Sequence, residues 1–418
     1  MHPDQDSLEF YSPAARYDLK NSIIDANEVE FIQVADALIY PDSGLISVLR
    51  KAKMKTLKNC KIAANAVTKY HKIDSATVDI FARKDYFGTG IYTYKDAAGG
   101  RQQIRFNSIN VDSSYQTYAK GSISDDRGFT LSPYFEFKGD VRLEASNKDL
   151  TFNGYSRLRH QCYEAIPLEW FSFKAAIDPE EIFIPIGKTL NNEDDDLLTS
   201  SIVLDKDTGE IYSSFVSVKR SDKDPNLLPA SGYLTYNDDA NEYRISTINK
   251  LTQSSLSGQY MSLASEECKV YNEGKLGFGI NPGQLDLSTV GNITHDLKAQ
   301  KVELDVMILL DFFFESKLID DMGKTMAENA LGEPSDFERD TYQKGLREFI
   351  GTDDADKLIA TITLTGEFRK YPSELEKNIF LTEVKLKWNP ETDSYQSVGK
   401  IGVGNIGKRQ VNVKVYGK

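Results

Sequence analysis

The stretch LTYNDDANEYRI, which runs from Leu234 to Ile245, decides how this chain folds. It places an apolar residue two positions before Tyr236, then a polar turn, then Tyr243 two positions before another apolar residue. Alternation with a period of two on both sides of a turn rich in Asn and Asp is typical of a β-hairpin. The stretch therefore predicts strand, turn, strand.

Related spacings occur in three other parts of the chain. They are Leu8-x-Phe10 before Tyr17, Tyr92-x-Tyr94 before Ile104, and Leu386-x-Trp388 before Tyr395. The aromatic residues comprise 22 Tyr and 21 Phe against only 2 Trp, and Tyr and Phe favour pleated strands. These observations predict a mainly β protein.

A longer self-similarity joins two parts of the chain. Glycines recur about 140 residues apart, as in a duplicated unit. The first copy holds Gly90, Gly121, Gly139 and Gly154, and the second holds Gly232, Gly258, Gly274 and Gly291. His160 and His295 keep the same register, and Tyr94 and Tyr236 are expected to be equivalent and largely buried.

We predict a repetitive β-solenoid or open β-jellyroll array with an inserted helical hairpin, because a solenoid tolerates any length. The predicted parts are a partial N-terminal β repeat at 1–72, β repeat units at 73–200 and 201–314, a helical insertion at 315–358, and the start of a truncated third repeat at 359–418. We expect the chain to be an internal segment of a larger protein.

The predicted helices lie where the apolar period changes from two to 3.6, after Phe314. Ser335 and Glu338 have the spacing of a capping box, which predicts a helix that ends at Ile350. The apolar stripes are Leu318, Ile319, Met322 and Met326 on the first helix, and Phe337, Leu346, Phe349 and Ile350 on the second. We expect these residues to cover an open edge or groove of the array, in preference to docking a partner.

Charge and cysteine content exclude several classes of protein. The net charge is -13 with a pI near 5.0, and the basic residues are scattered, which argues against binding nucleic acid or an anionic membrane. No signal peptide is expected at the start, and the apolar run from Val306 to Phe314 is too short to span a bilayer. Cys60, Cys162 and Cys268 lie far apart, so we expect buried free cysteines and no disulfide framework.

Two motifs resemble chemical sites. Gly402-x-Gly404-x-x-Gly407 has the dinucleotide spacing but leads into an alternating strand, so no cofactor is predicted. Asp205, Asp207 and Glu210 form a weak calcium candidate, which we interpret as a turn. No catalytic residue is predicted, and we expect the protein not to be an enzyme.

One phrase carries a family resemblance. Phe135-x-Phe137-x-Gly139-x-Val141-x-Leu143-x-Ala145, followed by Leu150-x-Phe152-x-Gly154, resembles the OstA-like β-jellyroll family of outer-membrane lipopolysaccharide transport. The resemblance implies short strands stacked into an open, V-shaped array. It also implies a place in the periplasm or at the outer membrane of a Gram-negative cell envelope.

Three functions follow as expectations. The first is a non-catalytic scaffold or conduit of the cell envelope that binds partner proteins or an amphipathic glycolipid. The second is a β-solenoid that binds or cleaves polysaccharide, which needs a row of exposed aromatic and carboxylate groups on one face. The third is an adhesin stalk, which needs long uninterrupted rungs.

Overall fold

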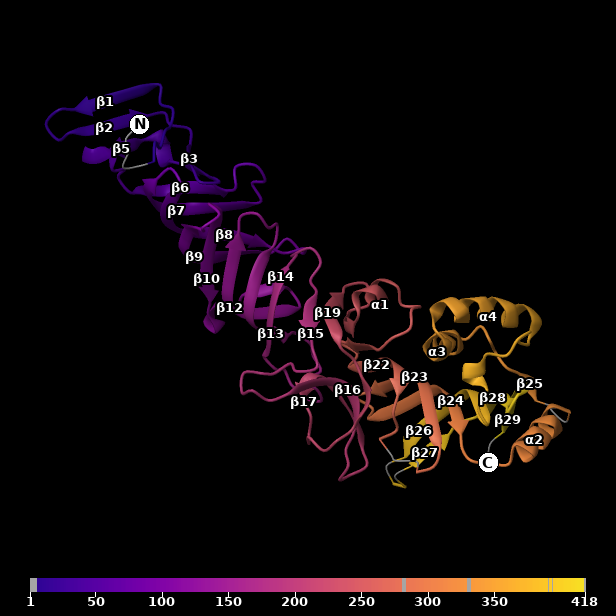
Figure 1. The fold of residues 1–418 in the computed structure, drawn as a ribbon. Coiled ribbons are helices and arrows are strands. Elements are labelled where there is room, and N and C mark those ends of the chain that lie inside the picture. Colours follow the sequence, from indigo (N-terminus) through magenta and orange to yellow (C-terminus); the bar gives the residue numbers. More distant parts are fainter. Residues whose placement is uncertain (1–5, 280–282, 329–331, 390, 393, 417–418) are drawn as a thin grey trace. The chain divides into compact units, whose positions relative to one another are not determined.

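A computed structural model describes residues 6–279, 283–328, 332–389, 391–392 and 394–416 (Figure 1). The chain forms two compact units. Unit 1 holds the residues up to Arg159 together with Ser172–Ile184, and unit 2 holds His160–Phe171 and the residues from Pro185 onward. The prediction of a mainly β protein is confirmed, with antiparallel sheets and a half-barrel. The predicted repeat boundaries stay a prediction.

Unit 1 is built on one antiparallel sheet with the order β14-β13-β12-β10-β9-β8-β7-β6-β4-β3, in which β11 also pairs with β12. Unit 1 also contains a separate small sheet with the order β1-β2-β5. The strands are β1 (Ala14–Asp18), β2 (Ile23–Asn27), β3 (Ile32–Val34), β4 (Ala37–Tyr40), β5 (Ile46–Val48), β6 (Leu57–Ala64), β7 (His71–Ala82), β8 (Asp85–Lys95), β9 (Arg101–Val111), β10 (Thr117–Ile123), β11 (Thr130–Ser132), β12 (Phe135–Glu144), β13 (Leu150–Leu158) and β14 (Phe171–Ile177).

Aromatic side chains form much of the core of unit 1. Contacts between rings on distant strands show that the sheet is curved. Phe137 on β12 packs against Phe152 on β13 with ring centroids 5.0 Å apart. Tyr94 on β8 also reaches Phe152, at 5.8 Å, although three strands lie between β8 and β13 in the sheet order. The contact requires the sheet to bend around a shared core, because neighbouring strands are about 4.8 Å apart.

Unit 2 has a second long antiparallel sheet with the order β15-β19-β20-β21-β22-β23-β24-β26-β28-β29-β25, and β27 also pairs with β26. A separate small sheet has the order β17-β16-β18. The strands are β15 (Ile184–Ile186), β16 (Leu198–Leu204), β17 (Ile211–Val218), β18 (Asn226–Pro229), β19 (Gly232–Asn237), β20 (Glu242–Ser246), β21 (Tyr260–Ala264), β22 (Lys269–Leu276), β23 (Asp286–Asp296), β24 (Lys301–Asp311), β25 (Glu333–Pro334), β26 (Ile379–Asn389), β27 (Ser394–Ser397), β28 (Lys400–Ile406) and β29 (Arg409–Tyr416). The helices are α1 (Ile248–Thr252), α2 (Ser316–Glu328), α3 (Asp340–Ile350) and α4 (Thr352–Thr365).

The helical insertion is longer than predicted and starts differently. The predicted capping box is wrong, because α3 begins at Asp340 and its N-cap residue is Arg339. The predicted return to strand at 359 is also wrong, because α4 occupies this stretch and the next long strand is β26. The run Ile359-Ala-Thr-Ile362-Thr is rich in β-branched residues, which favour strands. Burial of Ala355, Ile359 and Ile362 at helical spacing outweighs that preference.

Substitution of Phe349 measures how much the packing of the helices contributes to the stability of unit 2. Phe349 is half-buried on α3, and its ring lies 6.1 Å from that of Phe380 on β26. Phe349→Asp should lower the free energy of unfolding by about 2 kcal/mol, because it places an unpaired carboxylate in an apolar contact. Denaturant titration measures the change. Leu364→Asp, at an 86% exposed position on α4, is the matched control and should change stability little; equal effects would contradict the packing assigned to Phe349.

The repeated glycines share a local geometry in two hairpins. Gly139 and Gly154 are direct cross-strand partners on β12 and β13, and Gly274 and Gly291 are direct partners on β22 and β23. A Cβ atom at Gly154 would lie 2.3 Å from the Lys138 carbonyl oxygen, so the backbones there are too close for any side chain.

The other predicted correspondences are less alike. Gly90 lies within β8 and Gly232 begins β19, whereas Gly121 lies within β10 and Gly258 follows α1 outside any strand. Tyr94 is buried and Tyr236 is half-buried. The likeness covers the two glycine-paired hairpins, and the duplication stays a prediction.

Candidate functional site

The long sheet of unit 2 has two faces of different character. Helices α3 and α4 cover one of them, where Met307 and Leu309 on β24 and Phe380 on β26 pack against Leu346 and Ile362 of the helices. Phe337, Phe349 and Ile350 of the predicted stripes join the same cluster. These residues therefore cover a sheet face, and not an edge.

The opposite face is aliphatic over four strands. Side chains alternate along a strand, so the residues between Met307 and Leu309 and on either side of them point away from the helices. Direct cross-strand partners point to the same side of a sheet. Ile308 on β24 pairs with Leu381 on β26, and Leu381 pairs with Val403 on β28, so the face continues across these strands. We call the following set the apolar face: Leu304, Val306, Ile308 and Leu310 of β24; Leu381, Val384 and Leu386 of β26; Ile401 and Val403 of β28; Val413 and Val415 of β29.

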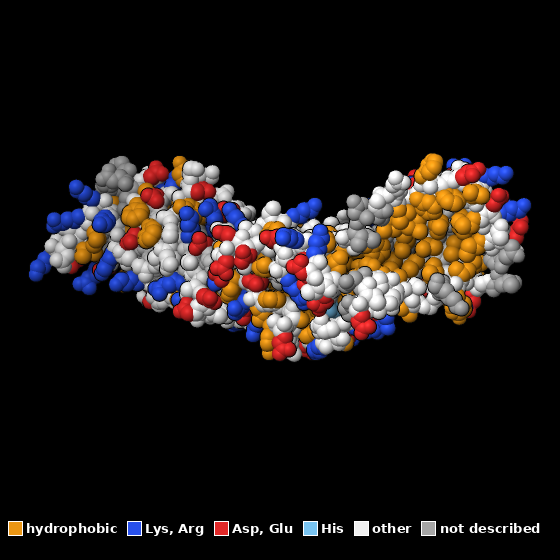
Figure 2. Space-filling view, turned by 90° about the horizontal axis from the view of Figure 1, so that it is seen from below, with side chains coloured by type: hydrophobic (Ala, Val, Ile, Leu, Met, Phe, Trp, Pro, Cys, Tyr) orange, Lys and Arg blue, Asp and Glu red, His pale blue; other side chains and the backbone are white. Residues whose placement is uncertain are grey.

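Part of the apolar face is open to solvent, although six of its eleven residues are buried and Leu381, Val413 and Val415 also pack against the cluster around Ile319 of α2. Leu310, Leu381, Ile401, Val413 and Val415 are only half-buried. Figure 2 shows the result as a broad continuous hydrophobic area, at the right of the view, beneath the strands β24 to β29 of Figure 1. Large continuous apolar areas are uncommon on soluble proteins and mark sites of interaction.

Two elements cover the ends of the apolar face. At the β28–β29 end, Ile319 of α2 packs with Val403, Ile406 and Val411. At the β22 end, β18 closes over the sheet, where the side-chain amide of Asn272 donates a hydrogen bond of 2.6 Å to the Leu228 carbonyl oxygen. The strands between these two covers form the open part of the apolar face.

Helix α2 does not bury the whole stripe predicted for it. Ile319 is buried and Met326 is half-buried, but Leu318 and Met322 are exposed. Gly323 allows the close approach of the helix, since a Cβ atom there would lie 2.8 Å from the Ile406 carbonyl oxygen. The chain before α2 adds two more exposed rings, Phe313 at 98% and Phe314 at 51%.

Charged groups of unit 2 gather on the helix-covered side of the sheet. Glu273 on β22 is buried and lies 2.8 Å from the amines of both Lys250 and Lys344, and the Tyr271 hydroxyl donates to it at 2.6 Å. Burial alone would raise the pKa of Glu273, but the charge of Lys250 and the hydrogen bonds from both lysines and Tyr271 lower it below its usual value. The cluster joins α1 and α3 to the sheet.

A disulfide between Cys162 and Cys268 corrects the expectation of free cysteines. The segment that leaves unit 1 after Arg159 brings Cys162 to the turn after β21, and no sequence spacing shows this approach. Cys60 is free and buried, and burial raises the pKa of its thiol to about 11.

The two histidines of the predicted repeat lie near this disulfide. His160 accepts a hydrogen bond from the Cys162 backbone N–H at 3.1 Å, and the Nδ1 atom of His295 lies 2.8 Å from the Ser213 hydroxyl. Burial lowers the pKa of both histidines to about 4, so both are neutral near pH 7.

The weak calcium candidate is a hairpin turn between β16 and β17. The Asp205 carboxylate accepts the backbone N–H groups of Asp207 and Thr208, and Arg220 lies 2.6 Å from Glu210. Within the described ranges, no group of three or more His, Cys, Asp or Glu side chains could hold a metal ion. Gly402, Gly404 and Gly407 lie in and just after β28, which leads into β29 and not into a helix.

Trp388 and Tyr395 are cross-strand partners on β26 and β27, with ring centroids 4.9 Å apart. Their pairing extends the sheet beside the apolar face. None of the helices in the described part of the chain is long and apolar enough to cross a membrane. No protein-family model, curated protein or solved structure matches this chain.

Proposed function

We propose that unit 2 binds the hydrocarbon chains of an amphipathic lipid on its apolar face, without chemical catalysis, as part of a larger cell-envelope protein. The observation that carries the proposal is the sheet face that α3 and α4 leave open. Bound hydrocarbon would remove this area from water, which stabilises the complex by about 25 cal/mol per Å².

The composition of the apolar face favours hydrocarbon over a protein partner. Its residues are all Val, Ile and Leu. Interfaces between proteins concentrate Tyr, Trp and Arg at their energetic centres, whereas here Trp388, two positions after Leu386, and its partner Tyr395 lie at the margin of the apolar face and not at its centre. The strands beneath it are paired with neighbours on both sides, so only side chains are offered to a ligand. Flexible acyl chains need only an apolar side-chain surface, because they have no hydrogen-bonding groups to satisfy.

Two further observations support a place in the cell envelope. Disulfides persist mainly in oxidising compartments such as the bacterial periplasm, and Cys162–Cys268 is a disulfide. The β12–β13 phrase is similar to OstA-like proteins of lipopolysaccharide transport. As part of this proposal, we keep the predicted β-solenoid or open jellyroll array as the architecture of the longer protein.

Binding of the fluorescent fatty acid cis-parinaric acid tests the proposal. The double variant Leu310→Asn and Leu381→Asn places two amides at half-buried positions on the apolar face. We expect it to weaken parinaric acid binding at least tenfold, because bound acyl chains would desolvate amide groups without hydrogen-bond partners. Fluorescence titration of the whole chain measures the dissociation constant.

The matched control is Leu364→Asn on α4, which removes an exposed leucine from the helical side of unit 2. It should bind parinaric acid as tightly as the unaltered protein. The proposal is wrong if the unaltered protein does not bind the fatty acid, or if the double variant binds it equally well while remaining folded by circular dichroism.

A further inference from the structure

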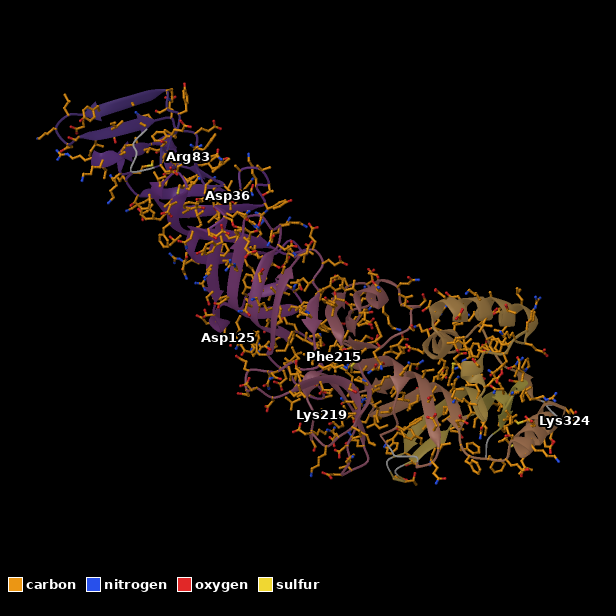
Figure 3. All side chains as sticks on the ribbon, viewed as in Figure 1. Asp36, Arg83, Asp125, Phe215, Lys219 and Lys324 are labelled. Carbon is orange, nitrogen blue, oxygen red and sulfur yellow. A yellow bond between two sulfur atoms is a disulfide. The ribbon has the colours of Figure 1, made fainter. Side chains whose placement is uncertain are left out.

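Unit 1 contains a cavity of about 640 Å³ that is separate from the apolar face of unit 2. It lies between the segment before β1, the β3–β4 hairpin, and the turns that follow β7 and β9. Cavities of about 300 to 1,000 Å³ are the usual size of small-molecule sites. Figure 3 labels Asp36 and Arg83, two of its lining residues, in the same region of unit 1.

Aromatic rings form one part of the lining. Phe31 and Tyr115 line the cavity, and their side chains are 39% and 50% exposed. The Lys84 amine lies 4.3 Å from the centre of the Tyr115 ring, so a cation already contacts one face of this ring, and a ligand ring would stack on the other face or displace the amine. Such rings offer flat apolar surfaces with little conformational freedom to lose.

Charged groups form the other part. Glu28, Glu30 and Arg83 line the cavity, and within the described ranges their side chains form no ion pair. Asp36 is held in place through one carboxylate oxygen, which accepts hydrogen bonds from the Thr117 backbone N–H at 2.9 Å and its hydroxyl at 2.6 Å. Its other carboxylate oxygen is buried and finds no hydrogen-bond partner among the described residues.

We propose that this cavity binds a saccharide. A sugar ring has an apolar C–H face that stacks on aromatic rings, and hydroxyl groups that both donate and accept hydrogen bonds. The exposed carboxylates of Glu28 and Glu30 accept such bonds, and the exposed Arg83 guanidinium donates them. A hydrocarbon would leave these charged groups unpaired. A phosphate would be disfavoured because the lining holds four carboxylates, of Glu9, Glu28, Glu30 and Asp36, against two cations, Arg83 and Lys84.

Screening of the whole chain on a glycan array, followed by calorimetric titration with the best-binding oligosaccharide, tests the inference. Tyr115→Ala should weaken binding about tenfold, because it removes one stacking surface. Tyr115→Phe keeps the ring and should bind normally. Tyr70→Ala removes a tyrosine of unit 1 that is 51% exposed and lies outside the cavity lining, so it should also bind normally.

Three results would overturn the inference. They are no glycan bound by the unaltered protein, unchanged binding in Tyr115→Ala, and equal loss in Tyr70→Ala. Binding of a lysine-rich peptide in place of glycans would assign the cavity to cations and would equally reject a saccharide. Tyr115→Ala should leave parinaric acid binding unchanged, so failure of this inference and failure of lipid binding by unit 2 give different results.

Discussion

Reduction of the Cys162–Cys268 disulfide should lower the unfolding temperature of unit 2 by roughly 10 °C. The bond joins residues 106 positions apart. Closing a loop of this length removes conformational freedom from the unfolded chain and stabilises the folded state by about 5 kcal/mol. Both sulfur atoms are in buried residues, so the Cys162→Ser and Cys268→Ser double variant is the direct measurement, by scanning calorimetry.

Unit 1 provides the internal control. Its only cysteine is Cys60, which is free. Its unfolding transition should therefore keep the same midpoint in the double variant and under a reducing agent. If both transitions shift together, the loop-closure explanation is wrong.

Glu273→Gln should destabilise unit 2 by about 3 kcal/mol. The substitution keeps the size of the side chain but leaves the Lys250 amine, in a side chain only 2% exposed, without its carboxylate. Uncompensated buried charges are strongly destabilising. Glu267→Gln, on the turn before β22, breaks the exposed pair with Lys269 and is the matched control, with an expected loss below about 1 kcal/mol.

The same residue gives a pH dependence of defined sign. The folded-state pKa of Glu273 lies below its usual value, so its contribution to stability is complete above the unfolded pKa of about 4.3. The contribution is lost as the pH falls through the lower folded-state pKa. Denaturant titrations between pH 3 and pH 7 should show a smaller acid loss in Glu273→Gln, and an unchanged slope would contradict the buried cluster.

Local hairpins could be predicted from the sequence because their signal is local. Leu234 pairs with Ile245 and Tyr236 with Tyr243, and Tyr92 pairs with Ile104, as the alternation predicts. The prediction of a strand at Leu8 and Phe10 is wrong, because these residues lie outside any strand and the first strand of the described part of the chain begins at Ala14. The Leu8-x-Phe10 pattern shows alternation, but a strand also needs a neighbouring strand to pair with, and a pattern of three residues does not reveal whether one is present.

The sequence of β24 contains a signal for the apolar face. In β24, Val306 to Leu310 are apolar without interruption, which indicates a strand that is apolar on both faces. The sequence does not show which of the two faces a helix covers. The disulfide and the cavity of unit 1 also depend on residues that only the fold brings together.

The order in which the three cysteines occur along the chain affects how the disulfide can form. Unit 1 needs β14, whose residues follow Cys162, and the partner Cys268 comes much later. Cys268 lies 106 positions after Cys162, so the Cys162 thiol has no partner until this stretch has reached the compartment in which it is oxidised. Early burial of Cys60 in β6 would remove the other thiol available for mispairing in that interval. Burial of Cys60 thus favours the correct pairing of Cys162 with Cys268.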